Sequence, residues 1–358
     1  MSKSHYIIPI FVPHEGCPHN CVFCNQESIT GITEKVDADY TEKIIEQYLQ
    51  TIDNNNAVVE VSFFGGTFTA IDIDKQKELL QVAKKYKDNG KIDYIRISTR
   101  PDYINEEILD NLKMYSLDII ELGVQSLDED VLLKSGRGHT GEDVYNASKL
   151  IKKYGFTLGH QIMLGLPGDN FKKDIQTARK VIKMKPSICR IYPALVIKNT
   201  PMERMYLNGI YKPYTLDEAV EICKDIYGMF LSSNINVIRV GLQPTEEINV
   251  GKELLEGPFH PAFRELVDGS IYNDMILDNL KYINEENIIL RVNPRDISKL
   301  YANKKQFFND MKKQLKTIKI KVIQDDLIKR GELIIEGDKK CNKLSFGEYI
   351  QNKYKKGY

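Results

Sequence analysis

The residues of this chain best suited to chemistry are three cysteines near its start. Cys17, Cys21 and Cys24 follow one another at the spacing C-x3-C-x2-C, and Phe23 comes directly before the last of them. Three thiolates on one short loop can hold three irons of a four-iron cluster and leave the fourth iron open to another molecule. An electron-transfer cluster is held by four cysteines. The spacing therefore indicates an iron–sulfur site built for chemistry.

Two other uses of these cysteines remain open. A structural zinc ion takes four ligands, and His14 or His19 could complete such a set, but no second C-x2-C or H-x3-H motif follows. A disulfide framework is the other alternative. The remaining cysteines, Cys189, Cys223 and Cys341, are far apart in sequence, which is not typical of a disulfide scaffold.

The composition is that of an ordinary globular protein, with 42% hydrophobic and 28% charged residues among 358. The apolar stretch 6–12 is short and interrupted by Pro9, so we expect no signal peptide. No apolar run approaches the length of a membrane span. With several free cysteines as well, we expect a cytoplasmic protein with no membrane partner.

The net charge is zero, but the charges are unevenly distributed. From residue 281 to the end, 19 Lys and Arg stand against 10 Asp and Glu. A basic segment of this kind is either a solvated surface or a nucleic-acid contact. Because the lysines alternate with acids, charge alone favours the solvated surface slightly.

The first two-thirds of the chain alternates strand-like and helix-like segments. Apolar β-branched runs predict strands at 6–12, 58–64, 94–98, 119–124, 157–164 and 188–192. Apolar residues at helical spacing predict helices at 40–52, 75–86, 105–115, 142–154 and 172–184. This order predicts an α/β fold with a parallel sheet, either doubly wound or an open barrel.

The second part of the chain is less regular. Residues 193–213 predict a loop with one short helix, followed by a helix at 214–231 with Thr215 as its N-cap. A strand at 234–241, a loop at 251–260 and a helix at 261–280 come next. A small α/β appendage then has strands at 288–292, 318–323 and 332–336 and a Lys-rich helix at 304–316.

Polar or glycine-rich turns follow each of the first five strands. They are the cysteine loop, 65–67, 99–102, 125–126 and 165–168. In parallel α/β folds the site lies at the carboxyl ends of the strands. We therefore expect these turns to meet on one face.

Several residues in these turns have both a structural and a binding interpretation. Gly65 and Gly66 either allow tight strand packing or let a small zwitterionic group approach the backbone closely. Arg100 either braces its loop by pairing with Asp102 or faces a ligand. Gln125 ends a buried strand, where an amide can hydrogen-bond to ribose or a base edge.

Two charged residues point to a polar interior. Arg137 stands between Gly136 and Gly138, and its planar guanidinium matches a carboxylate. Glu121 shares strand parity with Gly123 and Gln125, so we expect it to face the lumen, because charged residues are seldom buried without a partner.

The set resembles the radical S-adenosylmethionine (SAM) superfamily. The resemblance rests on the cysteine loop with Phe23, the Gly65-Gly66 turn and the segment Leu164-Gly-Leu-Pro-Gly168. It implies a partial (β/α)6 barrel, a [4Fe–4S] cluster on Cys17, Cys21 and Cys24, and SAM chelated to the fourth iron. Gly65, Gly66 and Thr67 would line the SAM amino group. Similarity to the oxygen-independent coproporphyrinogen oxidase branch implies SAM contacts from Gln125, Arg137 and Gln161, although that branch has an aspartate where Gln161 stands.

Residues 5–245 further resemble the catalytic subunit of Elongator and its bacterial and archaeal relatives. The stretches that carry this likeness are 98–102, 121–126, 136–140, 191–197 and 201–214. That family has an N-terminal tRNA-binding extension and a C-terminal acetyltransferase domain. Fewer than eighty residues follow Tyr282, without a glycine-rich acetyl-coenzyme-A loop, so we do not expect acetyl transfer. We predict a radical SAM core at 1–245, a connecting loop and helix at 246–286, and a small basic domain at 287–358.

The resemblance implies an enzyme that cleaves SAM reductively and abstracts hydrogen from its substrate. Loops at 193–213 and 241–261 would set the substrate, and 257–261 is either a contact or a rigid connector. The cofactor set adds Arg100 and Glu121 as candidate contacts, and an electron donor such as flavodoxin or ferredoxin is implied. A tRNA base, in a reaction like wobble-uridine modification, is the first substrate hypothesis. A small-molecule or protein substrate is the alternative, and a non-enzymatic iron–sulfur or zinc-binding module is a third.

Overall fold

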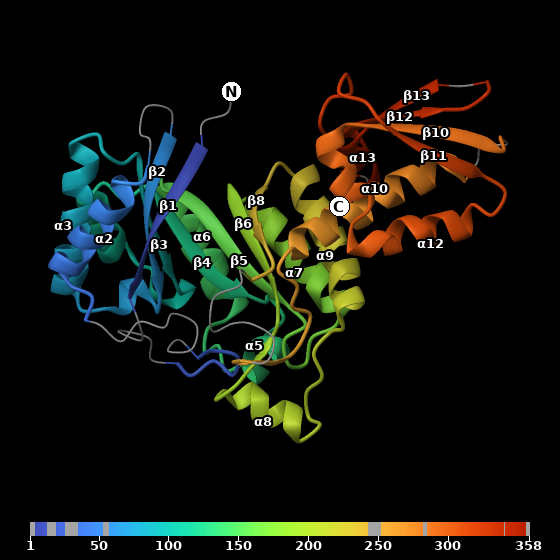
Figure 1. Cartoon of the computed structure of the whole chain (residues 1–358). Coiled ribbons are helices and arrows are strands. Elements are labelled where there is room, and N and C mark those ends of the chain that lie inside the picture. The colour runs from blue at the N-terminus through green and yellow to red at the C-terminus, as the bar shows by residue number, and fades with distance from the viewer. Residues whose placement is uncertain are drawn as a thin grey trace.

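A seven-stranded parallel sheet forms the main body of the protein (Figure 1). The computed structural model describes residues 4–12, 19–25, 35–52, 57–242, 252–281, 285–339 and 341–355. The sheet has the order β1-β2-β3-β4-β5-β6-β8. Its strands are β1 (Ser4–Val12), β2 (Ala57–Gly65), β3 (Tyr94–Thr99), β4 (Ile119–Gln125), β5 (Thr157–Leu164), β6 (Ile188–Pro193) and β8 (Asn236–Val240). The predicted parallel α/β fold is confirmed as an open barrel, and the strand predicted at 234–241 joins the same sheet.

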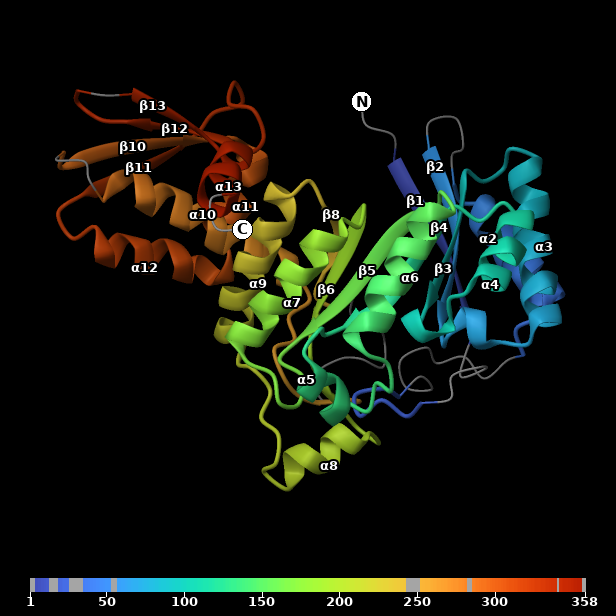
Figure 2. The same cartoon turned by 180° about the vertical axis from the view of Figure 1, so that it is seen from behind.

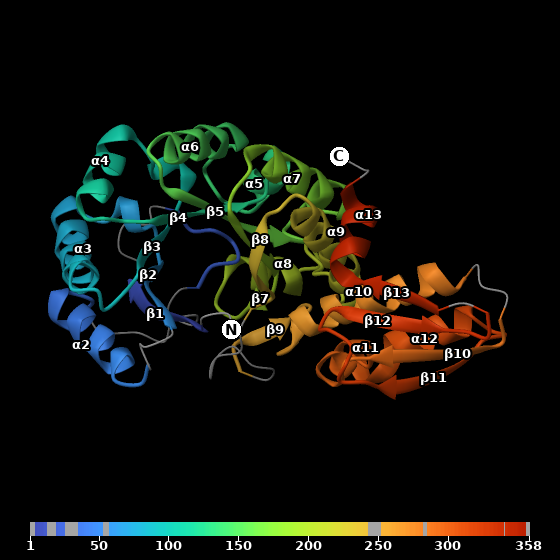
Figure 3. The ribbon, with the colours of Figure 1, turned by 90° about the horizontal axis from the view of Figure 1, so that it is seen from above.

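Six long helices cover the outer face of the curved sheet (Figure 3). They are α2 (Ala38–Leu49), α3 (Ile73–Asp88), α4 (Glu106–Met114), α6 (Gly141–Lys153), α7 (Phe171–Met184) and α9 (Leu216–Ser232). Side-chain caps fix where they begin: the predicted N-cap Thr215 accepts from the backbone of Glu218 in a capping box. The five helices predicted before residue 190 are confirmed, with ends within three residues. The short helix α5 (Glu129–Lys134) was not predicted.

The two faces of the sheet have opposite character. Outward side chains such as Ile97 and Leu122 are fully buried against the helices. Inward side chains include Glu60, Arg96 and Glu121, which are also almost fully buried. Because strand residues alternate between faces, one face builds the apolar core and the other a polar lumen.

The carboxyl ends of the strands meet at one edge of the barrel, at the bottom of Figure 1. The cysteine-loop residues 19–25, α5 and α8 (Pro201–Leu207) gather there. The predicted short helix in 193–213 is confirmed by α8. The prediction of a loop at 251–260 is partly wrong, because β9 (Leu254–Glu256) lies within it and pairs antiparallel with β7 (Val196–Ile197). Such a short pairing between distant segments leaves no local pattern.

A four-stranded mixed sheet forms the C-terminal part, with the order β11-β10-β12-β13 (Figure 2). Its elements are β10 (Asn287–Val292), α11 (Ile297–Leu300), α12 (Gln306–Gln314), β11 (Lys319–Gln324), β12 (Glu332–Glu336), β13 (Cys341–Ser345) and α13 (Phe346–Tyr354). The predicted strands and Lys-rich helix are confirmed, whereas β13, α11 and α13 were not predicted.

Helix α10 (Phe263–Leu280) connects the two cores. Its first half, including Phe263 and Ile271, packs into the barrel core, and its second half, including Met275 and Leu280, packs under the mixed sheet. Helix α13 returns to the barrel, where Tyr354 packs against α9. The proposed division at 246–286 stays a prediction.

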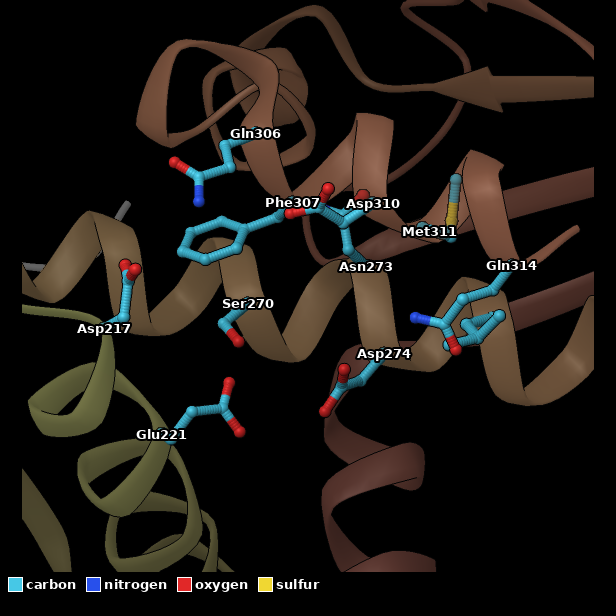
Figure 4. A pocket seen from close by; sticks show the side chains of 11 residues that line it. Asp217, Glu221, Ser270, Asn273, Asp274, Gln306, Phe307, Asp310, Met311 and Gln314 are labelled. Carbon is cyan, nitrogen blue, oxygen red and sulfur yellow. The ribbon is translucent and has the colours of Figure 1, made fainter.

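A cavity of about 260 Å³ lies between α9, α10 and α12 (Figure 4). Four carboxylates line it, together with uncharged side chains, and no lysine or arginine does. The acidic residues are Asp217, Glu221, Asp274 and Asp310. Glu221 and Asp274 are paired with Lys224, so salt bridges offset part of this negative charge.

The helices in the described ranges are those of a protein without a transmembrane helix in these ranges. None of them has the length and apolar character needed to cross a membrane.

Candidate functional site

The described part of the cysteine loop is a tight turn at the mouth of the barrel. The backbone N–H of Cys24 donates to the carbonyl of Cys21 at 3.0 Å, which brings two of the three predicted thiols onto one turn. Cys21 is buried and Cys24 is half-buried. Cys17 and His14 lie outside the described residues.

Neighbouring elements hold this turn on two sides. The N–H of Val22 donates to the carbonyl of Ser135 at 3.0 Å, and the N–H of Met202 donates to the carbonyl of Val22 at 2.9 Å. Phe23 packs on an apolar cluster formed by Val131, Leu166 and Ala194. The aromatic residue of the motif thus anchors the loop to the ends of α5, β5 and β6.

His19 is the first described residue of the cysteine loop. Its Nε2 is 3.8 Å from a carboxylate oxygen of Asp102, and a Cβ on Gly138 would lie 2.3 Å from its ring. Burial, followed by the positive charge of Arg100, lowers its pKa. In the described ranges no three His, Cys, Asp or Glu side chains form a metal-binding group. The zinc alternative also needs Cys17, which lies outside the described residues, so it stays an alternative prediction.

Arg137 reaches from the turn after α5 to the cysteine loop. Its Nη1 donates to Cys21 Sγ at 3.2 Å, and its Nη2 donates to the carbonyl of Gly123 at 2.7 Å. Gly136 and Gly138 both have positive φ, at 64° and 72°, which a side chain would disfavour. These glycines let the guanidinium pass the backbone, as the sequence suggested.

Arg100 braces this arrangement. Its Nε and Nη2 donate to the two carboxylate oxygens of Asp102 at 3.0 and 2.9 Å, and Nη2 also donates to the carbonyl of Arg137. The pairing within the loop is therefore confirmed. A contact between Arg100 and a cofactor stays a prediction.

The Gly65-Gly66 turn lies where β1 and β2 end. The N–H of Gly66 donates to the carbonyl of Val12 at 3.0 Å, and a Cβ on Gly65 would lie 2.5 Å from that oxygen. Gly65 has φ of 109°, which excludes other residues on conformational grounds too. Thr67 follows and is buried. Tight strand packing therefore explains Gly65, and the contact of Gly66 with a cofactor stays a prediction.

Gln125 and Gln161 form a pair inside the barrel, near the carboxyl end of β4. Gln161 Nε2 lies 3.4 Å from Gln125 Oε1. The pairing of β4 with β5 shifts register between Gly123 and Gln125, and Gln125 has a positive φ of 63°. At this β-bulge the side chain of Gln125 departs from the regular alternation of the strand. The sequence predicted the shared face, but gave no sign of the bulge.

Glu121 faces the lumen as predicted and is held by two arginines. One carboxylate oxygen accepts from Arg96 at 3.1 Å and from Arg190 at 2.9 Å. Arg96 also bonds to Glu60, and the Arg190 guanidinium lies 5.3 Å from the centre of the Phe64 ring. Both arginines therefore bond to the same oxygen, Oε2 of Glu121. Its proposed contact with the cofactor stays a prediction.

A buried carboxylate pair was missed. Asp169 and Asp174 follow the end of β5, and Tyr214 donates to Asp174 Oδ2 at 2.8 Å. Burial raises the pKa of Asp169 to about 6; burial and the neighbouring charge of Asp169 raise that of Asp174 well above its usual range. Two acids five residues apart could have suggested a shared site, but only the fold shows their burial.

The segment 257–261 lies at the barrel mouth beside the ends of β6 and β8. Pro258, Phe259 and His260 line a gap of about 10 Å³ together with Pro193 and Gly241. His260 Nδ1 accepts from the N–H of Ala262 at the start of α10. This supports the connector interpretation. Residues 243–251 of the neighbouring loop lie outside the described residues.

The donor groups at the mouth fit an anionic or zwitterionic ligand. Ser98 Oγ, Arg100 Nη1 and Arg137 Nε are buried and have no hydrogen-bond partner in the described part of the chain. Unsatisfied buried donors are costly, so a ligand that accepts hydrogen bonds would stabilise them. An open parallel barrel with a cysteine turn and such donors at its carboxyl edge defines a cofactor-dependent enzyme of the iron–sulfur class.

Comparison with protein families agrees with this class. Residues 11–181 match the model of the radical SAM superfamily, and residues 186–273 match the Radical_SAM C-terminal domain. The chain belongs to the radical SAM superfamily, and it is an enzyme of that superfamily. The family implies a [4Fe–4S] cluster and SAM as cofactors.

The chain is also similar to several individual proteins. It is 28% identical over 256 residues to a tRNA uridine(34) acetyltransferase of Methanocaldococcus jannaschii, covering 60% of this chain and 47% of that protein. It is 28% identical over 262 residues to human Elongator complex protein 3, covering 61% and 48%. An uncharacterized protein of M. jannaschii is 33% identical over 215 residues, covering 57% and 65%.

One solved structure shares the fold over most of the chain. It is the archaeal Methanocaldococcus infernus Elp3 with an N-terminal deletion, at a TM-score of 0.61 and 24% identity, covering 78% of this chain and 64% of that one. The chain spans about half the length of the acetyltransferase and Elongator relatives that it matches.

Proposed function

We propose that the protein cleaves SAM at a [4Fe–4S] cluster held by Cys17, Cys21 and Cys24, and abstracts hydrogen from a base of tRNA. When bound, the cluster and SAM supply one-electron reduction and a hydrogen-abstracting radical. The contribution of the protein is to position SAM, to orient the substrate and to exclude water.

Each candidate residue has a role in this proposal. Cys21 and Cys24 share one turn, which suits ligation of neighbouring irons. Gly66 and Thr67, beside Gly65, would take the amino group of SAM. Arg100 and Arg137 keep unpartnered buried donors that suit its carboxylate. In the lumen, Gln125 and Gln161 would bind its ribose or base, while Glu121 fixes the arginines below them.

The substrate assignment rests on one observation. About 60% of the chain is similar to a tRNA uridine(34) acetyltransferase and to Elongator complex protein 3. The chain matches only about half the length of those proteins. The proposal is therefore limited to the radical reaction and does not include acetyl transfer.

The basic C-terminal region offers a phosphate-binding surface for such a substrate. Many of its cations are paired with acids, such as Arg291 with Glu336. Lys319 and Lys321 differ, because they are exposed and form no salt bridge in the described ranges. They alternate with inward-facing residues of β11, so both lie on the uncovered face of the mixed sheet. Two such charges on an edge strand suit contact with a nucleic-acid backbone.

Product formation in the presence of RNA tests the substrate class. Reconstituted, reduced protein with SAM is incubated with total tRNA, with the same tRNA after nuclease digestion, and with a peptide digest. We expect 5′-deoxyadenosine formation to rise with intact tRNA only. Stimulation by the peptide digest, or equal rates in all three reactions, would exclude tRNA and favour the small-molecule or protein alternative.

A further inference from the structure

Arg137 is a buried cation without a carboxylate partner. Its side chain is only 6% exposed, and no Asp or Glu of the described ranges forms a salt bridge with it. The neighbouring Arg100 differs, because Asp102 neutralises it with two hydrogen bonds. A buried charge without a counter-charge is costly, so anionic groups beside Arg137 would stabilise it: the proposed SAM carboxylate suits its free Nε, and a cysteine thiolate suits its Nη1.

The group that Arg137 contacts is the sulfur of Cys21. The distance from Nη1 to Sγ is 3.2 Å, within the range of a hydrogen bond to sulfur. Three further contacts fix the direction of this bond. Nη2 is tied to the carbonyl of Gly123, Arg100 holds the carbonyl of Arg137, and the backbone of Ser135 holds the cysteine turn. The pairing is therefore built into the scaffold and does not depend on a mobile side chain.

We propose that Arg137 sets the reduction potential of the cluster through its charged hydrogen bond to Cys21 Sγ. This rests on the proposed function, in which Cys21 is an iron ligand. Hydrogen bonds to cluster sulfurs and nearby charge are levers on the potential of iron–sulfur sites. Reduction adds one negative charge to the cluster, and a guanidinium beside a ligand sulfur stabilises that added charge. Arg137 thus makes the cluster easier to reduce.

The test is redox titration of the reconstituted full-length protein, followed by the electron paramagnetic resonance signal of the reduced cluster. In Arg137→Gln the amide keeps polarity but removes the charge. We expect the equilibrium constant for reduction to fall about tenfold, which for a one-electron couple lowers the midpoint by about 59 mV. Arg137→Lys keeps the charge, so its shift should be smaller. Lys153→Gln is the matched control, because it removes one positive charge from a side chain that is 68% exposed.

The resonance Raman spectrum gives a second readout that does not depend on activity. Loss of a hydrogen bond to one ligand should raise the iron–sulfur(cysteine) stretching frequency in Arg137→Gln and leave it unchanged in Lys153→Gln. If Arg137→Gln assembles no cluster, the comparison of Arg137→Lys with wild type decides. A shifted stretch in Arg137→Lys supports the proposal, and a wild-type stretch overturns it, because lysine keeps the charge but lacks the guanidinium that spans Gly123 and Cys21.

The failures of the two proposals are distinguishable. If Arg137→Gln holds a full cluster with the wild-type midpoint and spectrum, the tuning role is wrong and the enzyme proposal stands. If the wild-type protein itself binds no [4Fe–4S] cluster, the proposed function falls, and this inference with it, before any variant is compared.

Discussion

Replacing Asp174 by Asn tests the buried carboxylate pair at the end of β5. Asp174 is only 1% exposed and lies beside Asp169, so the two carboxyls share a proton. The amide introduced by Asp174→Asn would mimic the protonated acid: its oxygen can accept from Tyr214, and its NH2 can donate to Asp169. The substitution therefore removes the need for a proton while keeping the hydrogen bonds.

The magnitude follows from the raised pKa values. Unfolded aspartates lose their proton near pH 3.8, whereas burial raises the pKa of Asp169 to about 6 and raises that of Asp174 well above its usual range. A group with a raised folded pKa contributes stability that is present below the unfolded pKa and is lost as pH rises through the folded pKa. A difference of about two units corresponds to about 3 kcal/mol. Because Asp169 is partly exposed, we expect Asp174→Asn to be about 2 kcal/mol more stable than wild type at pH 7.

The assay is urea and thermal unfolding of the two proteins between pH 4 and pH 8. We expect almost no difference at pH 4 and a difference that grows through pH 6, with a rise in Tm of roughly 2–3 °C at pH 7. Asp130→Asn is the control, because hydrogen bonds from Lys134 and Lys173 lower the pKa of that exposed acid. A variant less stable than wild type at pH 7, or a difference independent of pH, would refute the reasoning.

Three further predictions concern the glycine turn, the lumen and the basic surface. Gly65→Ala should lower the free energy of unfolding by at least about 2 kcal/mol and reduce bound iron, because its new Cβ meets the carbonyl of Val12. The control Gly90→Ala also has positive φ but meets no atom within 4 Å, so it should lower the free energy of unfolding by about 1 kcal/mol. Urea unfolding measures both values. Glu121→Gln should cost about 3 kcal/mol by leaving two buried arginines short of charge, and an unchanged SAM dissociation constant by calorimetry would assign it a structural role only. The double variant Lys319→Ala, Lys321→Ala should bind RNA more weakly in filter binding. The slope of log binding constant against log salt concentration should fall by the equivalent of about two phosphate contacts. Unchanged binding would mean that RNA contacts another surface.

The strand and helix order was predictable because its signals are local. Apolar runs such as 157–164, bounded by Gly155 and Gly165, mark a buried parallel strand without any knowledge of its partners. The convergence of turns at the carboxyl edge follows from parallel topology alone. Cap residues such as Thr215 likewise act within a few residues of themselves.

The missed features depend on contacts between distant residues. The pairing of β7 with β9 joins segments more than fifty residues apart through two register positions. The partners of Glu121 follow from the register that brings Arg96 and Arg190 to the same level of the lumen, and the sequence does not encode that register in any local pattern. The contacts of Arg137 with the carbonyl of Gly123 and the sulfur of Cys21 likewise join distant segments, while the carboxylate partner suggested by the sequence stays a prediction.

The most direct test of the account is the product of anaerobically reconstituted, reduced protein incubated with SAM. We expect about four irons per chain and the formation of 5′-deoxyadenosine and methionine. Cys21→Ala and Cys24→Ala should abolish both the cluster and the product, whereas Cys341→Ala, an exposed cysteine on β13, should leave both unchanged. Zinc in place of iron, with no 5′-deoxyadenosine from the wild-type protein, would contradict the central claim.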